Sequence, residues 1–313
     1  MLNIPKGSTN FIITYLDKKN YDLNYIDKLT VKMLGYPQSG WIDLKSTKMT
    51  KIEFLYKLTT SKAALKKVTL IPGETYYFFL QEVANKLDIS TTKLFESYSK
   101  FGYKIDGNII ADTYYLPLGM DENQLIQHLF NQTNIKYEKF SKKIFGVYDK
   151  KNWFRYIIIA SIIQKEAASK NEMPKISSVI YNRLKKNMKL QMDGTLNYGK
   201  YSHQRITPKF IKEDKSDYNT YKIKGLPSNP VCAVEFEAIK AAIFPSSTDY
   251  LYFMKSADGK YHDFSNSYKK HRRNISKIKK LNKIKKQKIN KKNKKVSTKK
   301  TSKNDNKLKN LWK

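Results

Sequence analysis

A carboxylate lies on the apolar side of a predicted helix. Residues 157–168 read IIIASIIQKEAA, and in a helix Ile159, Ile162, Ile163 and Glu166 fall at i, i+3, i+4 and i+7, on one stripe facing a core. An acid in that position adds nothing to solubility. Its placement indicates either a structural ion pair or an acid whose protonation is set by its surroundings.

The two explanations of Glu166 require different neighbours. The ion-pair partner would be Arg183, which shares a side of the next predicted helix with apolar residues. Alternatively, removal from water raises the pKa of the carboxyl group and keeps it protonated near neutral pH. Such an acid can protonate a leaving oxygen, as glycosidic-bond cleavage requires. Periodicity alone favours the structural explanation.

A conventional sugar hydrolase needs a second carboxylate, either about 5 to 5.5 Å away as nucleophile or farther away to activate water. Asp193 and Asp112 are the candidates, although each also has an ordinary role in a turn. Nearby segments are rich in Tyr, Asn, Gln and Thr, which stack on sugar rings and hydrogen-bond hydroxyl groups: LQMDGTLNYG, DYNTYKIKGLP and ADTYY. These residues indicate a carbohydrate cleft only weakly.

A helix pair must position Glu166. The segment NWFRYIIIASIIQKEAASK predicts a helix over 152–170, and Asn171 with Pro174 predicts the start of a second helix over 174–188. The short connection predicts antiparallel packing of the two. The segment KLQMDGTLNYG then predicts an extended piece, an Asp-Gly turn and a short helix. DYLYFMKSADGKYHDFS predicts a hairpin, followed by a final helix from Ser265.

The preceding part of the chain predicts small α+β units. Residues 1–65 contain a strand and turn, LNIPKG, and two amphipathic helices, TNFIITYLDKKN and TKIEFLYKLTTSK. A strand over 67–71 then leads through a Pro-Gly turn into another helix. Residues 101–119 predict a structured loop with a short strand, of the kind that often lines clefts. A helix over about 121–144 follows.

The net charge of +34 is unevenly distributed. Residues 276–313 hold 17 lysines and one aspartate, and such a run of like charge predicts a disordered tail. Only five of the 61 basic residues are arginines, whereas proteins that read bases or clamp phosphates favour the guanidinium group. Charge therefore does not predict a nucleic-acid function.

The sequence implies no metal or cofactor. Cys232 is the only cysteine, which excludes an intramolecular disulfide and a cysteine zinc cluster, and the four histidines show no metal-ligand spacing. No apolar run reaches the length of a membrane span, and the first residues, MLNIPKGSTNFIITYL, lack the features of a signal peptide.

Several segments together resemble the YceG-like family of endolytic murein transglycosylases. They are ASIIQKEAASKNEMPKISSVIYNRLKKNMKLQMDGTLNYG, YNTYKIKGLPSNPVCAVEFEAIKAA, DYLYFMKSADGKYHDFSNSYKKH and the opening IPKGS. The resemblance runs in order from about residue 3 to 275. It implies an α+β fold in three parts: a LysM-like module over 1–65, a YceG-like catalytic domain over 66–275 and the lysine-rich tail over 276–313.

The resemblance implies an enzyme that cuts nascent peptidoglycan glycan strands internally and leaves 1,6-anhydro-N-acetylmuramic acid ends. The family's catalytic acid, the second in a Glu-Lys-Glu motif, matches Glu166, while Gln164 replaces the first acid. One residue then acts in turn as acid and base, because the substrate's own 6-hydroxyl attacks the anomeric carbon. Neither a second carboxylate nor a water is required.

Seven further residues match family motif positions, so the resemblance implies that they line the cleft; for each, a role in supporting the fold stays open. The expected cleft lies between the helix pair and the loops at 101–119, 190–199 and 218–230. Three motifs depart from the family pattern, among them Asp193-Gly194-Thr195 in place of Asp-Pro-Thr. The seven are Arg183, Gln191, Asp193, Thr195, Tyr198, Asn219 and Tyr221.

The resemblance also implies a cellular location and partners. Family members carry a transmembrane helix just before the IPKGS segment, so an anchor is expected upstream of this sequence, with the enzyme on the periplasmic face of the inner membrane. Expected partners are peptidoglycan strands, peptidoglycan synthases and, through residues 276–313, an anionic membrane surface. Two other functions stay open at this stage: a glycan-binding module without activity and a basic nucleic-acid-binding protein.

Overall fold

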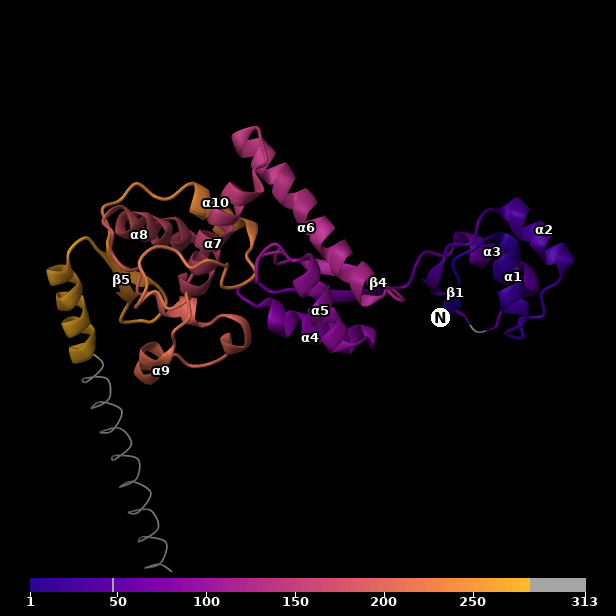
Figure 1. The fold of residues 1–313 in the computed structure, drawn as a ribbon, viewed down its shortest axis with the longest axis horizontal. Coiled ribbons are helices and arrows are strands. Elements are labelled where there is room, and N and C mark those ends of the chain that lie inside the picture. Colours follow the sequence, from indigo (N-terminus) through magenta and orange to yellow (C-terminus); the bar gives the residue numbers. More distant parts are fainter. Residues whose placement is uncertain (47, 282–313) are drawn as a thin grey trace, which may run out of the picture.

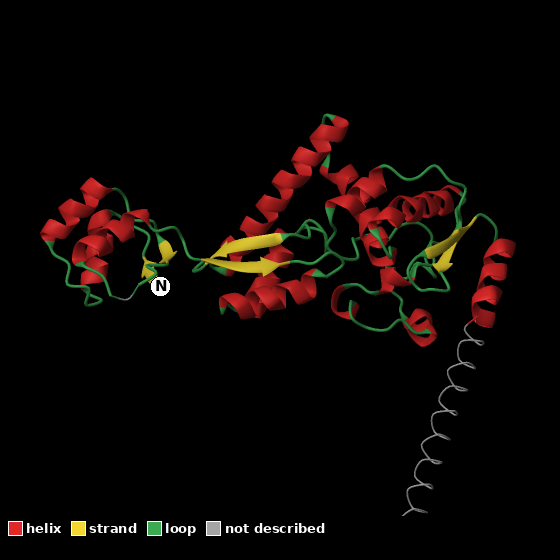
Figure 2. Ribbon diagram, turned by 180° about the vertical axis from the view of Figure 1, so that it is seen from behind, coloured by secondary structure: helices red, strands yellow, loops and turns green. Residues whose placement is uncertain are grey.

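The computed structural model of the chain describes residues 1–46 and 48–281. It is a mixed α+β protein in which helices predominate and the described strands form three separate two-stranded antiparallel sheets. Figure 2 shows one sheet in each of three successive parts of the chain. No helix in the described ranges combines the length and apolar character needed to cross a bilayer.

Residues 1–65 form a unit with its own core (Figure 1). Strand β1 (Leu2–Ile4) pairs antiparallel with β2 (Gly40–Ile42), and helices α1 (Thr9–Asp17), α2 (Tyr25–Leu34) and α3 (Lys51–Thr60) pack beside them. Ile13, Leu16 and Leu58 are fully buried between these elements. The predicted strand and both predicted helices are confirmed. Helix α2 was not predicted, and its large apolar side chains face outward.

The second part holds another core. Strand β3 (Leu65–Thr69) pairs with β4 (Thr113–Pro117), and α4 (Tyr76–Leu87), α5 (Thr91–Phe101) and the long α6 (Glu122–Phe145) cover this sheet. The strand predicted over 67–71 begins two residues earlier than expected. Ala233, far along the chain, also belongs to this core and exchanges backbone hydrogen bonds with residues 73 and 74. These bonds join the second part to the third.

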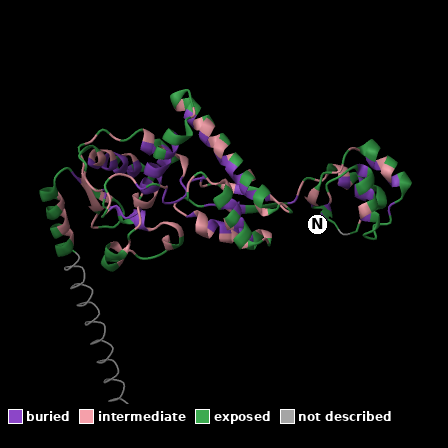
Figure 3. Ribbon diagram, in the orientation of Figure 1, coloured by how far each residue is buried: buried purple, intermediate pink, exposed green. Residues whose placement is uncertain are grey.

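The third part is built around α7 (Lys150–Glu166). Helices α8 (Met173–Lys185) and α10 (Phe236–Ile243) pack against it, and strands β5 (Tyr252–Lys255) and β6 (His262–Ser265) form the predicted hairpin. Figure 3 shows the buried residues concentrated on these inner helices. The remaining elements are short: η1 (Lys170–Glu172), η2 (Asp193–Leu196), η3 (Gly199–Tyr201) and α9 (Pro208–Glu213).

Several local predictions about this part are corrected. The helix expected over 152–170 ends at Glu166, because the backbone becomes extended at Ala167. Asn171 does not cap the second helix: it lies within η1, the cap position is Glu172, and Pro174 occupies the first turn as predicted. The final helix, predicted from Ser265, covers 268–281 because Ser265 ends β6, and residues 276–281, predicted to be disordered, are helical. The rest of the predicted disordered tail, 282–313, lies outside the described residues.

Candidate active site

The end of α7 places Glu166 between the core and a cavity. Ile159, Ile162 and Ile163 of the predicted stripe are buried, while Glu166, the last helical residue, is partly exposed. The stripe thus leads out of the core and ends in a carboxyl group. At the C-terminal end of a helix the macrodipole disfavours negative charge.

One oxygen of the Glu166 carboxyl group is held by a hydrogen bond. Its Oε1 accepts a hydrogen bond of 2.7 Å from the backbone N–H of Gly194, and no described group is hydrogen-bonded to Oε2. Because the protonated oxygen of a carboxylic acid is the poorer acceptor and Oε1 already accepts the Gly194 N–H, a proton on this group resides on Oε2. Removal from water raises the pKa of Glu166 to about 7; the Gly194 N–H opposes this rise and the nearby charge of Asp193 adds to it.

Gly194 allows this close approach because it has no side chain. A Cβ atom there would lie 2.6 Å from Cβ of Lys165 and 2.9 Å from Oε1 of Glu166, which is closer than real contacts allow. The flexible residue in place of the family's proline therefore contributes a hydrogen bond that a proline, without an N–H, could not make.

Asp193 and Tyr221 form a second polar pair at the cavity. The hydroxyl of Tyr221 donates a hydrogen bond of 2.6 Å to Oδ1 of Asp193, and burial together with this carboxylate raises the pKa of Tyr221. Asp193 thus lies near Glu166, whereas Asp112, the other candidate carboxylate, pairs with Lys136 at the start of β4. Only one of the two candidates is at the site.

Arg183 does not pair with Glu166, so the ion-pair explanation of the apolar stripe is wrong. Its Nε donates to the carbonyl of Leu251 at 2.6 Å, and its Nη1 donates to the carbonyls of Lys189 and Leu190 at 3.1 and 2.8 Å. The guanidinium group also lies 5.1 Å from the ring centroid of Tyr252. Arg183 therefore holds the 189–191 loop and the hairpin strand β5 beside each other.

A cavity of about 530 Å³ opens beside Glu166. Five of the eight predicted site residues line it: Glu166, Arg183, Gln191, Asp193 and Tyr221. Its other wall comes from residues that the sequence analysis did not assign to the site, in the hairpin and the final helix. These include Tyr252, Lys255, His262, Tyr268, His271 and Ile275.

The remaining three predicted residues lie off this cavity. Thr195 has no exposed surface, and its hydroxyl donates to the carbonyl of Met192 at 2.8 Å. Asn219 is equally enclosed and its amide donates to the carbonyls of residues 211 and 214. The ring of Tyr198 stacks on Tyr218 with centroids 4.1 Å apart. All three make contacts that hold the loops bordering the cavity.

The predicted cleft loops contribute unequally. The 190–199 loop supplies Gln191 and Asp193, and the 218–230 loop supplies Tyr221, but the 101–119 loop supplies no lining residue. That loop instead packs against residues 228 and 229 through Lys104 and Ile105. Gln164, at the position of the family's first acid, accepts a bond from the backbone of Glu235. In the described ranges no group of three or more His, Cys, Asp or Glu side chains could hold a metal ion.

Comparisons with known proteins show which sequences the chain resembles. The model of the YceG-like family matches residues 2–277. The endolytic murein transglycosylase of Bacillus subtilis (strain 168) is 30% identical over 279 residues, covering 87% of this chain and 74% of the relative. That of Streptococcus pneumoniae serotype 2 (strain D39) is 28% identical over 183 residues, covering 56% and 32%.

A solved structure is similar in fold. A YceG-like protein from Listeria monocytogenes superposes with a TM-score of 0.57 at 23% identity, covering 87% of this chain and 97% of that one. The predicted α+β class and the YceG-like arrangement of the elements are confirmed by this likeness.

Proposed function

The chain belongs to the YceG-like family, and from this premise we propose that it is an endolytic murein transglycosylase. It acts as a lyase on peptidoglycan, cutting nascent glycan strands between MurNAc and GlcNAc and leaving 1,6-anhydro-MurNAc ends that terminate elongation. The observation that carries this assignment is a carboxyl group with a pKa of about 7 facing a cavity of ligand size. The relatives support neither a glycan-binding module without activity nor a nucleic-acid-binding protein.

In the proposed mechanism Glu166 is first an acid and then a base. Its Oε2–H gives a proton to the glycosidic oxygen, the bond from C1 of MurNAc to that oxygen breaks, and positive charge develops at C1. The resulting carboxylate takes the proton of the 6-hydroxyl as O6 bonds to C1. The proton balance closes and no water enters, so each cut yields one anhydro end and one free hydroxyl.

The electrostatics of the site suit both halves of this cycle. With a pKa of about 7, Glu166 is largely protonated below neutral pH, yet its carboxylate is basic enough to recover a proton. The negative charge of Asp193 favours the protonated acid before cleavage, and it also favours positive charge on the sugar in the transition state. Tyr221 fixes Asp193 in this role through its hydrogen bond.

The other site residues divide into two groups in this proposal. Gln191 and Tyr221 contact the glycan, and Arg183 contacts it from its position between loop and hairpin. Thr195, Tyr198 and Asn219 act indirectly, because their hydrogen bonds and stacking set the loops on which Asp193 and Tyr221 are carried.

We assign the three parts of the chain to different tasks. Residues 1–65, with their separate core, form the LysM-like module and bind glycan. Residues 66–275 form the catalytic domain. The enzyme works outside the cytoplasm, on the periplasmic face of the inner membrane, in contact with peptidoglycan synthases.

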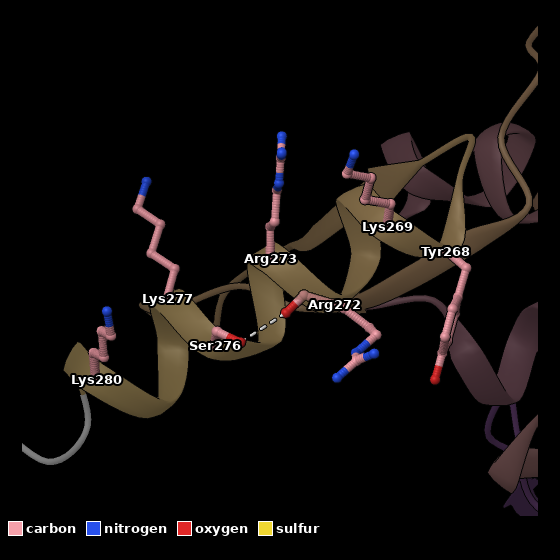
Figure 4. A pocket seen from close by; sticks show the side chains of 7 residues that line it. All are labelled: Tyr268, Lys269, Arg272, Arg273, Ser276, Lys277 and Lys280. Carbon is pink, nitrogen blue, oxygen red and sulfur yellow. Dashed lines mark hydrogen bonds between the residues drawn. The ribbon is translucent and has the colours of Figure 1, made fainter.

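The basic end of the chain contacts an anionic membrane surface in this proposal. On the helix 268–281, five cations line one shallow hollow, and none of them forms an ion pair with another described residue. Lys269, Arg273 and Lys277 project from one side of this helix (Figure 4). Their charge is available to lipid headgroups, and the lysines of 282–313 add to it.

Digestion of purified sacculi followed by mass spectrometry tests the activity. The parent protein should release fragments with anhydro ends, which are lighter by one water than hydrolytic ends. Glu166→Gln should release none while keeping the parental circular dichroism spectrum. Fragments carrying reducing ends, or equal release by the variant, would contradict the proposal.

A further inference from the structure

Helix α2 exposes an apolar stripe that no residue of 1–46 or 48–281 covers. Tyr25, Ile26 and Met33 have 71%, 69% and 89% of their surfaces exposed, and Leu29 is also exposed. At about 100° of rotation per residue these four side chains fall within one arc of about 100°. Val31, fully buried, lies on the opposite face and anchors the helix to its unit.

The stripe is unusual for a free surface. Large apolar side chains scattered singly are ordinary, but four on one face of a ten-residue helix form a continuous patch, and Tyr36, just beyond the helix, is also exposed. The helix lies at the outer edge of its unit, far from α7, which carries Glu166 (Figure 1). The patch therefore lies outside the candidate active site.

The charged residues of α2 that border the stripe are positive. Lys28 and Lys32 lie along one border, while the only acid of the helix, Asp27, is 6% exposed and points inward to an ion pair with Lys51 at 3.3 Å. Asp27 also accepts the backbone N–H of Asn24 in the capping box. Asp27 thus faces inward, and the charged residues that α2 presents beside the stripe are lysines.

We propose that α2 lies in the surface of a bilayer containing anionic lipid, with its apolar stripe among the acyl chains. Lys28 and Lys32 would reach the headgroups while their stems follow the apolar face, and Tyr25 and Tyr36 would sit at the polar boundary. A second copy of the chain is a poorer occupant, because two molecules of formal charge +34 repel each other. This inference does not depend on the proposed activity.

Vesicle co-sedimentation of the full chain tests the proposal. The probes are vesicles of phosphatidylglycerol and phosphatidylcholine, at low salt and at 0.5 M NaCl to suppress purely electrostatic binding by the basic end of the chain. The parent should bind in both. The triple variant Ile26→Ser, Leu29→Ser, Met33→Ser should lose about tenfold in partitioning at high salt.

A matched variant controls for loss of apolar surface in general. Ile135→Ser, Val147→Ser, Phe244→Ser changes three residues that are 65%, 61% and 53% exposed elsewhere, and it should bind like the parent. Met33→Ser alone, at the most exposed site, should show a partial loss. Circular dichroism confirms folding of each.

Two outcomes would overturn the proposal. One is parental partitioning by the triple variant. The other is a dimer, detected by sedimentation velocity without lipid, that the triple variant abolishes while vesicle binding is unaffected; the stripe would then be an interface between copies.

Discussion

Two carboxyl groups of this protein share a raised pKa and differ in what surrounds them. Burial raises the pKa of both Glu166 and Asp106 to about 7. Asp106 is 3% exposed and both its oxygens accept backbone N–H groups, from Tyr76 at 3.0 Å and Gly107 at 2.8 Å. Glu166 accepts one such bond and turns its other oxygen toward a cavity.

The comparison separates desolvation from catalysis. A raised pKa marks a carboxyl group that water does not reach well, which is equally true of a structural acid. Asp106 ties the start of α4 to the 101–119 loop, and both of its oxygens are occupied. Only Glu166 combines the proton with a free oxygen and space for a substrate. Access to a ligand therefore distinguishes the catalytic group.

The largest effect on the cleavage rate is expected from replacing Glu166, and it should distinguish Glu166 from Asp106. Replacement by Gln removes the transferable proton, and general acid–base catalysis contributes about 10²- to 10⁴-fold, so release of anhydro fragments should fall at least that far. Asp106→Asn, the matched substitution, should leave cleavage per folded molecule close to the parental rate. Timed digestion of sacculi measures both rates. Equal losses of cleavage in the two variants would contradict the assignment of Glu166 as the catalytic group.

Asp193→Asn should have the next largest effect, on the pH profile. The charge of Asp193 raises the pKa of Glu166, so its removal should lower that pKa. The rate requires protonated Glu166 and falls as pH rises through its pKa, so the alkaline limb should move to lower pH. Asp112→Asn, which changes an aspartate away from the cavity, should leave the profile in place. An unmoved limb in Asp193→Asn would refute the coupling.

Asp106→Asn should act on stability. An amide has one acceptor oxygen, so one of two buried N–H groups loses its partner, and the free energy of unfolding should fall by about 1–3 kcal/mol. The parent's stability should also decline with rising pH between the unfolded pKa, 3.8, and the folded value of about 7, because the folded state holds a proton that the unfolded state has released. Urea unfolding at pH 5 and pH 8 measures both, and the variant should lose the share of this decline that Asp106 contributes, while Glu166, whose pKa is also raised to about 7, keeps its own share.

The smallest effect on activity is expected from Tyr252, in the hairpin that lines the cavity opposite Glu166. Tyr252 presents its ring to the cavity between Arg183 and His271, and aromatic contacts contribute about 0.5–1.5 kcal/mol. Tyr252→Ala should therefore raise KM for soluble glycan strands by roughly two- to tenfold and change kcat less. Tyr261→Ala, at an exposed position of the same hairpin, serves as its control. A loss confined to kcat would place Tyr252 among the groups acting in the transition state.

The two walls of the cavity were unequally predictable: the wall made by Glu166 and the 190–199 loop, and the wall made by the hairpin and the final helix. Period and turn chemistry predicted α7, the 190–199 loop and the hairpin, since each depends on residues close in sequence. Arg183 joins the hairpin to the helix pair of Glu166. Its hydrogen bond to the Leu251 carbonyl connects residues 68 positions apart in the sequence. No local pattern encodes such a contact. The sequence therefore predicted an ion pair with Glu166, whereas Arg183 donates to backbone carbonyls of the 189–191 loop and of Leu251.

Direct titration of the Glu166 carboxyl group tests the central claim most closely. Carbon-13 labelling of glutamate side chains, with the Glu166→Gln variant to identify the resonance, follows this one group between pH 4 and 9. We predict a midpoint near 7, lower in Asp193→Asn. A midpoint near the ordinary value of 4.5 would mean that Glu166 carries no proton at neutral pH and would contradict the account.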